Sequence, residues 1–324
     1  MLFLGCDGGC TKYAYALVDE KGHVLAATRE KGFNYQLERG ERFDQHLKEH
    51  LAHLLDQAGV TRDEITFAAY GLAGYDEGPG VNADLLHAVT QALGHTRVQV
   101  CSDAALGWSG ALGSTAGISV VSGTGSIAYG EDEAGHTARC GGWSLEFGDE
   151  GSSCWIGKMG LNTFFRQADG RMPRTLLYDW FMDYFKLEDP LHLAQIVYDY
   201  MAGDFSRCAA LQYEMKKLYE AGDPCAHRIY QQAAQELGQL VSTLCGKLDL
   251  QEKPFRVSYS GGLFKAGACI LTPFRELVAG LGGTLAEPLY GPLIGAVGLA
   301  ARRFLSGDAL SGLLKVLQAS GQVE

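Results

Sequence analysis

Short apolar runs on either side of a glycine turn open the chain and return later in it. Residues 2–18 and 118–129 each contain a run typical of a strand, a turn with glycines and a hydroxyl residue, and a second run. Glycine tolerates the positive φ angles of tight turns, so both segments predict β-hairpins. A turn without bulky side chains exposes backbone N–H groups, which can form an anion-binding concavity. The two hairpins therefore predict two related lobes that close on one polyphosphate.

The elements after the first hairpin alternate between strand and helix. A third strand is predicted at 23–26, and apolar positions at helical spacing predict helices at 40–58 and 81–94. Further strands are predicted at 65–72 and 98–101. This alternation indicates a mixed α/β lobe, and the second hairpin begins a repeat of it.

The later part of the chain is more helical. Residues 151–250 have a largely helical pattern, a strand follows at 256–260, and a final helix is predicted at 290–303. We expect an N-terminal lobe of residues 1–112 and a C-terminal lobe of residues 113–324 that carries the helical insertion. The last helix is free to pack back on the N-terminal lobe.

Composition narrows the function classes. The 324 residues carry a formal net charge of -11, which argues against nucleic acid as a partner because binding it requires clustered Lys and Arg. Nine cysteines without a C-x-x-C pair predict reduced thiols. The longest apolar stretch near the end, 291–301, is too short to cross a membrane. We therefore expect a soluble cytoplasmic protein with no membrane or nucleic-acid partner.

Asp103 is the strongest single catalytic candidate. It follows an apolar strand and precedes a helix, and this edge of an α/β sheet is where ligands bind. A carboxylate near a phosphate site is what a hydroxyl nucleophile needs as its proton acceptor. The alternative interpretation is a helix N-cap, because Asp is a preferred capping residue.

Asp7, at the mouth of the first hairpin, is the candidate metal ligand. Magnesium is bound by one or two carboxylates together with substrate phosphates, so Asp7 is expected to bind Mg²⁺ through water. Thr11 and Lys12 follow in the same turn and can donate to phosphate oxygens. The alternative interpretation of Asp7 is an ordinary turn residue before glycine.

Residues 141–152 combine glycines, acids and a tryptophan, which suits neither a helix nor a strand and predicts a shaped loop. A tryptophan beside carboxylates can grip a sugar, because the ring covers an apolar face and the acids accept hydroxyl protons. A loop that only caps the following helix is the alternative. His46, His50 and His53 have spacing compatible with a metal site, but we expect them to be solvated.

Taken together, the motifs resemble those of the N-acetylglucosamine kinases, over essentially the whole chain. The segments that carry the resemblance are 7–12, 102–105, 122–126, 141–143, 148–152, 261–262, 287–292 and 295–296. Those enzymes are actin-like ATPases and share the BadF/BadG/BcrA/BcrD family with ATPases that activate acyl-CoA dehydratases and reductases. The resemblance implies an α/β, two-lobed actin-like (ribonuclease H-like) fold with duplicated mixed sheets.

The resemblance also implies roles for individual residues. Asp103 would be the base for the sugar 6-hydroxyl, and Thr11 and Thr124 would contact the ATP phosphates. The implied ATP contacts are Gly8, Gly9, Thr11, Lys12, Gly123, Thr124, Gly125, Ala210, Gly261, Gly262 and Ala266. The implied sugar contacts are Asn34, Asp103, Gly142, Trp143, Ser144 and Asp149.

The chain departs from the family pattern at two positions. Cys10 stands where the family usually has glycine, which can alter phosphate affinity. Ser144 stands where Trp143 is usually followed by glycine, which leaves the exact sugar open.

We expect an ATP-dependent kinase that transfers the γ-phosphoryl of Mg-ATP to the 6-hydroxyl of an amino sugar, N-acetylglucosamine being the leading candidate. A small sugar is then the partner, and a homodimer is expected. The alternative is an activator-type or switch ATPase of the same family that acts on a partner protein.

Overall fold

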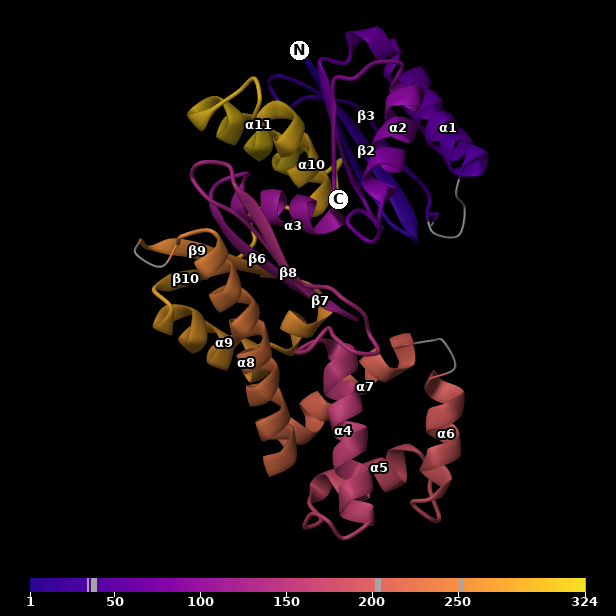
Figure 1. Cartoon of the computed structure of the whole chain (residues 1–324), viewed down its shortest axis with the longest axis vertical. Coiled ribbons are helices and arrows are strands. Elements are labelled where there is room, and N and C mark those ends of the chain that lie inside the picture. Colours follow the sequence, from indigo (N-terminus) through magenta and orange to yellow (C-terminus); the bar gives the residue numbers. More distant parts are fainter. Residues whose placement is uncertain (34, 36–39, 202–204, 251–252, 324) are drawn as a thin grey trace. The chain divides into compact units, whose positions relative to one another are not determined.

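The computed structural model describes the whole chain except residues 34, 36–39, 202–204, 251–252 and 324 (Figure 1). The chain divides into two compact units. The first comprises Met1–Ala116 and Glu287–Glu324, and the second comprises Gly117–Ala286. The chain therefore leaves the first unit near the predicted boundary and returns to it at residue 287, so the last segment groups with the N-terminal part.

The first unit contains a five-stranded sheet in the order β3-β2-β1-β4-β5. Its strands are β1 (Leu2–Gly8), β2 (Lys12–Asp19), β3 (Val24–Lys31), β4 (Phe67–Leu72) and β5 (Val98–Cys101). β1 and β2 form the predicted antiparallel hairpin and β3 extends it, whereas β4 and β5 run parallel to β1.

The second unit contains a sheet in the order β10-β9-β6-β7-β8. Its strands are β6 (Gly117–Ser122), β7 (Ser126–Glu131), β8 (Thr137–Gly141), β9 (Phe255–Ser260) and β10 (Gly283–Ala286). Read from β8, this sheet repeats the first one: an antiparallel hairpin, a third antiparallel strand, and two strands parallel to the first. The predicted duplication of a mixed sheet is confirmed.

In the described part of the first unit, three helices come from the N-terminal segment and two from the C-terminal segment. They are α1 (Glu41–Ala58), α2 (Val81–Leu93), α3 (Asp103–Leu112), α10 (Pro292–Ala301) and α11 (Gly307–Ser320), with a short 3₁₀ turn at Arg62–Glu64. All residues of α10 from Leu293 to Ala301 are buried, and the helix packs on α3, β1 and β4. Glycine allows the close approach, because a Cβ on Gly295 would lie 2.2 Å from the Leu106 carbonyl oxygen. The helix predicted as final is thus followed by α11, which we had not predicted.

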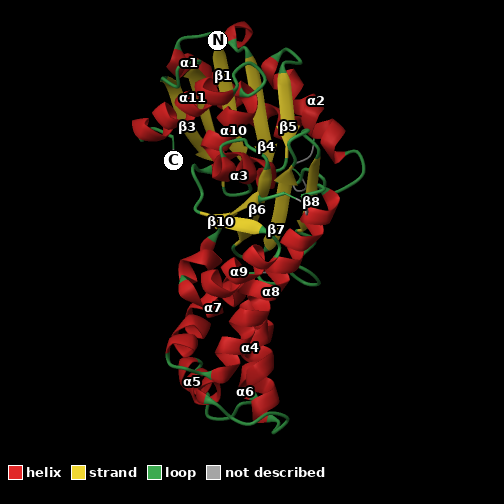
Figure 2. Ribbon diagram, turned by 90° about the vertical axis from the view of Figure 1, so that its left-hand side faces the viewer, coloured by secondary structure: helices red, strands yellow, loops and turns green. Residues whose placement is uncertain are grey.

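The second unit carries the predicted helical insertion between β8 and β9. Its helices are α4 (Ser153–Ala168), α5 (Leu176–Tyr184), α6 (His192–Met201), α7 (Phe205–Glu220) and α8 (Pro224–Lys247), followed after β9 by a 3₁₀ turn (Gly262–Ala266) and α9 (Ala268–Gly280). Within this unit, α4, α5 and α6 extend away from the strands (Figure 2). No helix in the described part of the chain has the length and apolar character needed to span a bilayer.

The expected solvation of the three histidines is wrong for His50, which is buried in the core of the first unit. Its Nδ1 lies 3.4 Å from the Tyr15 hydroxyl, and burial lowers the pKa of its ring. His46 stacks on Phe33 with ring centroids 5.0 Å apart, and His53 is exposed. His46 and His50 therefore pack among aromatic rings, whereas His53 contacts Glu30 at the surface. No group of three potential metal ligands occurs among the described residues.

Candidate functional site

The predicted site residues fall into two sets, one in each unit. The first unit holds Asp7, Gly8, Gly9, Thr11, Lys12 and Asp103, and the second holds Gly123, Thr124, Gly125, Gly142, Trp143, Ser144, Asp149, Ala210, Gly261, Gly262 and Ala266. Each set is described within its own unit. Asn34 lies outside the described residues.

In the first unit, the sheet brings Asp7 and Asp103 to the same edge. β1, β4 and β5 run parallel, with Asp7 level with Gly71 and Gly71 level with Cys101. Neighbouring strands are about 4.8 Å apart, so the Cα atoms of Asp7 and Cys101 lie roughly 10 Å apart. Asp103 follows Cys101 by two residues and begins α3. Both carboxylates are therefore at the carboxyl edge of the parallel strands, where ligands bind in α/β sheets.

Asp103 is not the N-cap of α3. Ser102 is the cap, and its hydroxyl accepts a hydrogen bond from the Ala105 N–H at 3.4 Å. Oδ1 of Asp103 accepts from the Ala104 N–H at 2.8 Å, and the residue is exposed. Ser102 therefore caps α3. The Asp103 carboxylate is held by a backbone N–H of the helix and is accessible to a ligand.

Asp7 is half-buried and its charge is only partly compensated. Burial raises the pKa of its carboxyl, Lys12 lowers it, and the Asp103 carboxylate raises it again. These three groups therefore lie within electrostatic reach of one another. Two carboxylates near a single lysine are hard oxygen donors with excess negative charge, which fits a site for Mg²⁺ beside a phosphate.

The first turn is held by the segment that follows β3. The Gly9 N–H donates to the Lys12 carbonyl oxygen at 2.9 Å, and the Gly32 N–H donates to the Thr11 carbonyl oxygen at 3.1 Å. A Cβ on Gly32 would lie 2.3 Å from the Lys12 nitrogen, so only glycine fits there. The side chains of Thr11 and Lys12 are exposed at the tip. The turn therefore presents a hydroxyl and an ammonium group on a fixed backbone.

The second turn has a similar internal bond. The Gly123 N–H donates to the Gly125 carbonyl oxygen at 2.9 Å, and the Gly123 carbonyl oxygen accepts from the Ser153 N–H at 2.9 Å. Ser153 is the first residue of α4, so the turn is joined to the start of that helix. Thr124 is exposed at the tip, as Thr11 is in the first turn.

Two serine hydroxyls complete the attachment of the second turn to the loop before α4. Ser122 donates to the Gly151 carbonyl oxygen at 3.0 Å, and Ser126 donates to the Glu150 carbonyl oxygen at 2.7 Å. Both serines are buried. The loop of residues 141–152 and the second turn therefore form one hydrogen-bonded assembly.

Packing requires glycine at Gly8 and Gly125, and the positive φ angles that the sequence suggested are absent from the four turn glycines. The glycines with positive φ in the described part of the chain do not include Gly8, Gly9, Gly123 or Gly125. A Cβ on Gly8 would lie 2.6 Å from the Tyr13 ring, which leaves no space for a side chain. The N–H groups of Gly9 and Gly123 are also bonded inside their turns. Phosphate contacts by those two amides, as predicted, would require these internal bonds to open or to be shared.

Asp149 is a buried carboxylate in the loop of residues 141–152. Its backbone is in the left-handed region (φ 55°), and its Oδ1 has no hydrogen-bond partner among the described residues. Burial raises the pKa of this carboxyl, and Glu150 raises it further. Hydrogen bonds from the backbone of Ser126 and Trp143, and the charge of Lys158, oppose that rise. A buried acceptor oxygen that lacks a donor is suited to a ligand hydroxyl.

The same loop exposes two large aromatic side chains. Trp143 is 78% exposed and Phe147 is 94% exposed. The Arg139 guanidinium lies 5.2 Å from the Trp143 ring centroid. Gly142 has a φ of 69°, and its N–H donates to the Ser126 carbonyl oxygen at 2.9 Å, which fixes the backbone before the tryptophan. The exposed ring is available to cover the apolar face of a sugar.

Ser144 stabilises the turn that follows Trp143. Its hydroxyl accepts from the N–H groups of Glu146 at 3.2 Å and Phe147 at 3.3 Å. Lys158 of α4 donates to the Leu145 carbonyl oxygen. The serine that departs from the family pattern therefore folds its own loop, and a lysine ties that loop to the helical insertion.

Only some of the residues predicted to contact the nucleotide lie near the second turn. Gly261 has a φ of 106°, and a Cβ there would lie 2.2 Å from the Ser122 carbonyl oxygen, directly at the base of the second turn. Gly262 is open, with no atom within 4 Å of an added Cβ in the described structure. Ala266 is buried and Ala210 is exposed on α7, which contacts the 3₁₀ turn. Gly261 and Gly262 thus adjoin the turn, whereas the Ala266 side chain belongs to the core.

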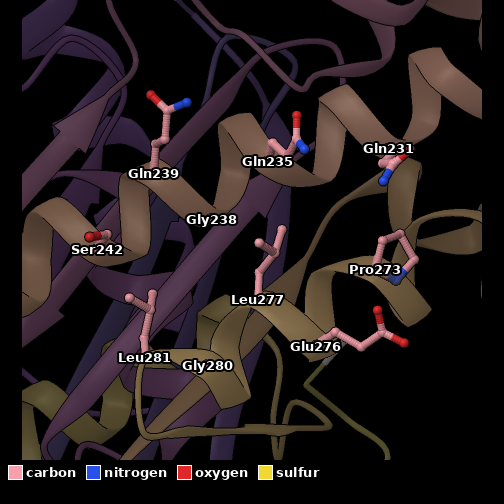
Figure 3. Close-up of a pocket in the computed structure, with 10 residues that line it drawn as sticks. All are labelled: Gln231, Gln235, Gly238, Gln239, Ser242, Pro273, Glu276, Leu277, Gly280 and Leu281. Atoms are coloured by element: carbon pink, nitrogen blue, oxygen red, sulfur yellow. The ribbon is translucent and has the colours of Figure 1, made fainter.

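A separate cavity of about 630 Å³ lies between α8 and α9 (Figure 3). It is lined by Gln231, Gln235, Gly238, Gln239, Ser242, Pro273, Glu276, Leu277, Gly280 and Leu281. Its lining includes no residue that the sequence predicted for chemistry. This cavity is therefore distinct from the candidate site.

Sequence reasoning did not assign three residues that shape the site. Gly32 supports the first turn, Lys158 binds the Trp143 loop, and Arg139 contacts the Trp143 ring. Gly32 stands two residues before Asn34, in the segment expected to contact the sugar, and this was its only signal. Lys158 and Arg139 do not form a recognisable sequence motif with the loop residues that they contact.

Comparison with known proteins gives concordant matches. Residues 4–300 match the BadF/BadG/BcrA/BcrD ATPase family. The N-acetylmuramic acid/N-acetylglucosamine kinase of Clostridium acetobutylicum is 28% identical over 277 residues, which cover 85% of this chain and 89% of that protein. The N-acetyl-D-glucosamine kinase of Dictyostelium discoideum is 27% identical over 274 residues, 81% of this chain and 85% of that protein.

Solved structures show the same fold. A provisionally named N-acetylglucosamine kinase from Chromobacterium violaceum matches with a TM-score of 0.69 at 23% identity, covering 91% of this chain and 97% of that chain. A ROK hexokinase from Thermus thermophilus matches with a TM-score of 0.59 at 20% identity, covering 94% and 99%. Together with the duplicated sheets, these matches confirm the predicted actin-like fold.

Proposed function

Since this chain belongs to the BadF/BadG/BcrA/BcrD ATPase family, we propose that it is an ATP-dependent kinase of amino sugars. It transfers the γ-phosphoryl group of ATP to the 6-hydroxyl of N-acetylglucosamine or a close derivative. Both relatives described above are amino-sugar kinases, and one of them is named for two acceptors. The observation that carries the proposal is the exposed Asp103 carboxylate at the start of α3, beside Asp7 and Lys12.

In the proposed reaction Asp103 acts as the general base. Its free carboxylate oxygen accepts the proton of the sugar hydroxyl as the sugar oxygen forms a bond to the γ-phosphorus. The bond between that phosphorus and the β,γ-bridging oxygen breaks, and ADP leaves. Catalysis of this kind depends on positioning and charge neutralisation, without a covalent intermediate.

The two turns and the loop would position the reactants. Thr11 and Lys12 donate to phosphate oxygens from the first turn, and Thr124 does so from the second. Trp143 and Asp149 bind the sugar, through the exposed ring and the unpartnered carboxylate oxygen. Asp7 would hold Mg²⁺, which neutralises phosphate charge when it is bound.

A coupled assay for ADP release tests the proposal. We expect ADP release only when an amino sugar is supplied, with one equivalent of a sugar phosphomonoester that ³¹P NMR assigns to the 6-position. Slow ATP hydrolysis that no sugar accelerates would instead favour the activator or switch ATPase. The homodimer and the cytoplasmic location remain predictions, and light scattering after gel filtration checks the first.

A further inference from the structure

Arg139 places a cation directly beside the exposed tryptophan of the loop. It lies on β8, paired with Tyr129 of β7, and its side chain extends to within 5.2 Å of the Trp143 ring centroid. Arg139 is half-buried, whereas Trp143 keeps 78% of its surface exposed. A ligand that covers the ring therefore comes within reach of the guanidinium.

No carboxylate in the described part of the chain neutralises the charge of Arg139. The ion pairs of the described residues do not include one to Arg139, and the cation that acts on the nearby Asp149 is Lys158. Stacking on an aromatic ring leaves the N–H groups of a guanidinium in its plane, where they remain available as donors. A planar fork of donors matches a carboxylate in a bidentate geometry.

The local charge also differs from that of the whole chain. The formal net charge is -11, so long-range attraction does not favour an anionic substrate. An anion would be bound here only through a local cation. Arg139 supplies that cation next to the ring proposed to bind the sugar.

We propose that the acceptor site takes an amino sugar that carries a carboxylate, with Arg139 binding the carboxylate while Trp143 covers the sugar ring. This inference rests on the proposed function, because it assigns Trp143 to the acceptor. Arg139 is then a specificity-determining residue: it lowers KM for the carboxylated acceptor relative to KM for a neutral acceptor.

Three acceptors separate charge from size: N-acetylmuramic acid, its methyl ester and N-acetylglucosamine. The ester keeps the bulk of the lactyl group and removes its charge. For the wild type we expect kcat/KM to be at least about tenfold higher for the acid than for the ester, the size of effect given by a charge-assisted hydrogen bond. In Arg139→Gln the preference for the acid over the ester should disappear through KM, while the ratio of kcat/KM between the ester and N-acetylglucosamine changes by less than about twofold.

Two further variants guard against a structural explanation. Arg139→Lys keeps the charge and should retain part of the preference for the acid. Arg256→Gln removes an exposed arginine from β9 of the same sheet and should leave all three acceptors unchanged. Equal losses on all three acceptors in Arg139→Gln, or an acid that reacts no faster than its ester in the wild type, would overturn the inference.

Binding of N-acetylmuramic acid, followed by calorimetry, makes the result independent of turnover. Acid binding that is lost in Arg139→Gln supports the carboxylate site even if no sugar is phosphorylated, in which case only the proposed function fails. If N-acetylglucosamine is phosphorylated but binding of N-acetylmuramic acid does not depend on Arg139, the proposed function holds and only the inference about Arg139 fails. No binding of the acid to the wild type also overturns the inference.

Discussion

Asp149 and Gly125 lie against each other in the second unit, so closely that a Cβ on Gly125 would be 2.4 Å from Oδ2 of Asp149. The residue proposed to bind the sugar is thus packed on the turn proposed to bind phosphate. This contact links the positions of the two substrates through a single buried carboxylate.

We expect Gly125→Ala to lower kcat/KM by more than about tenfold and to destabilise the second unit by about 1–3 kcal/mol, the usual range for overpacking. The added methyl group must displace Asp149, because the turn itself is bonded to α4. Kinetics and urea unfolding measure the two effects. Gly312→Ala is the control, since an added Cβ there meets no described atom within 4 Å and α11 gains helix propensity. Normal activity in Gly125→Ala would show that the contact has no role.

Asp103→Asn should reduce kcat by about 10²–10⁴-fold, the range typical of a positioned general base. Asparagine can keep the bond from the Ala104 N–H, so the fold and the sugar affinity should be preserved. Calorimetric titration with the sugar and steady-state kinetics test both statements. Ser102→Ala, which removes the helix cap, should instead cost about 1 kcal/mol of stability with a smaller effect on kcat. Turnover near the wild-type rate in Asp103→Asn would exclude this residue as the base.

Asp7→Asn should raise stability at neutral pH in the absence of Mg²⁺. Burial raises the pKa of the Asp7 carboxyl above its ordinary value of 3.8, Lys12 offsets part of this, and Asp103 adds to it. The folded state then binds the proton more tightly than the unfolded state, so the free energy of unfolding falls as pH rises from 3.8 through the raised pKa. Asparagine does not titrate and removes this loss.

The measurement is the melting temperature of Asp7→Asn and the wild type between pH 4 and pH 7. The advantage of the variant should grow with pH, while its kinase activity falls because the proposed Mg²⁺ ligand is gone. A variant that is less stable than the wild type at pH 7 would contradict the assigned cost of the buried charge.

Lys158→Met should raise KM for the sugar by about tenfold and leave KM for ATP unchanged. The substitution removes the donor to the Leu145 carbonyl oxygen, a bond to a charged group. It keeps an unbranched side chain to pack near the Phe205 ring, which lies 5.1 Å from Nζ of Lys158. Lys216→Met on the surface of α7 is a matched control. Equal changes in both KM values would indicate a general loss of structure.

Much of the fold could be predicted from the sequence because its signals are local. The two hairpins, the strand before Asp103 and the helical insertion follow from apolar periodicity and glycine turns. α11 was missed because it closely follows α10, which the sequence analysis took as the final helix. The burial of His50 was missed because a histidine on the edge of an apolar stripe is ordinarily solvated, and only the packing of Tyr15 and Phe33 decides otherwise.

The site was predictable as a set of motifs but not as a set of contacts. The exposed side chains of Thr11 and Thr124 agree with their expected position at the turn tips. The reason for the turn glycines was wrong, because packing against Tyr13 or Asp149 is a long-range property that a local φ preference cannot reveal. Arg139 lies only four residues before Trp143, but its contact with the ring depends on how the chain turns after β8, which no local pattern reveals.

The position of α10 in the chain bears on how the protein is made. This helix covers β1 and β4, yet it follows the entire second unit in sequence. On the ribosome, the first sheet therefore emerges with one apolar face bare and stays so until translation has passed residue 301. The residues of the second unit are contiguous, so that unit is fully synthesised earlier. We therefore expect the first unit to complete its folding last, although its synthesis begins first.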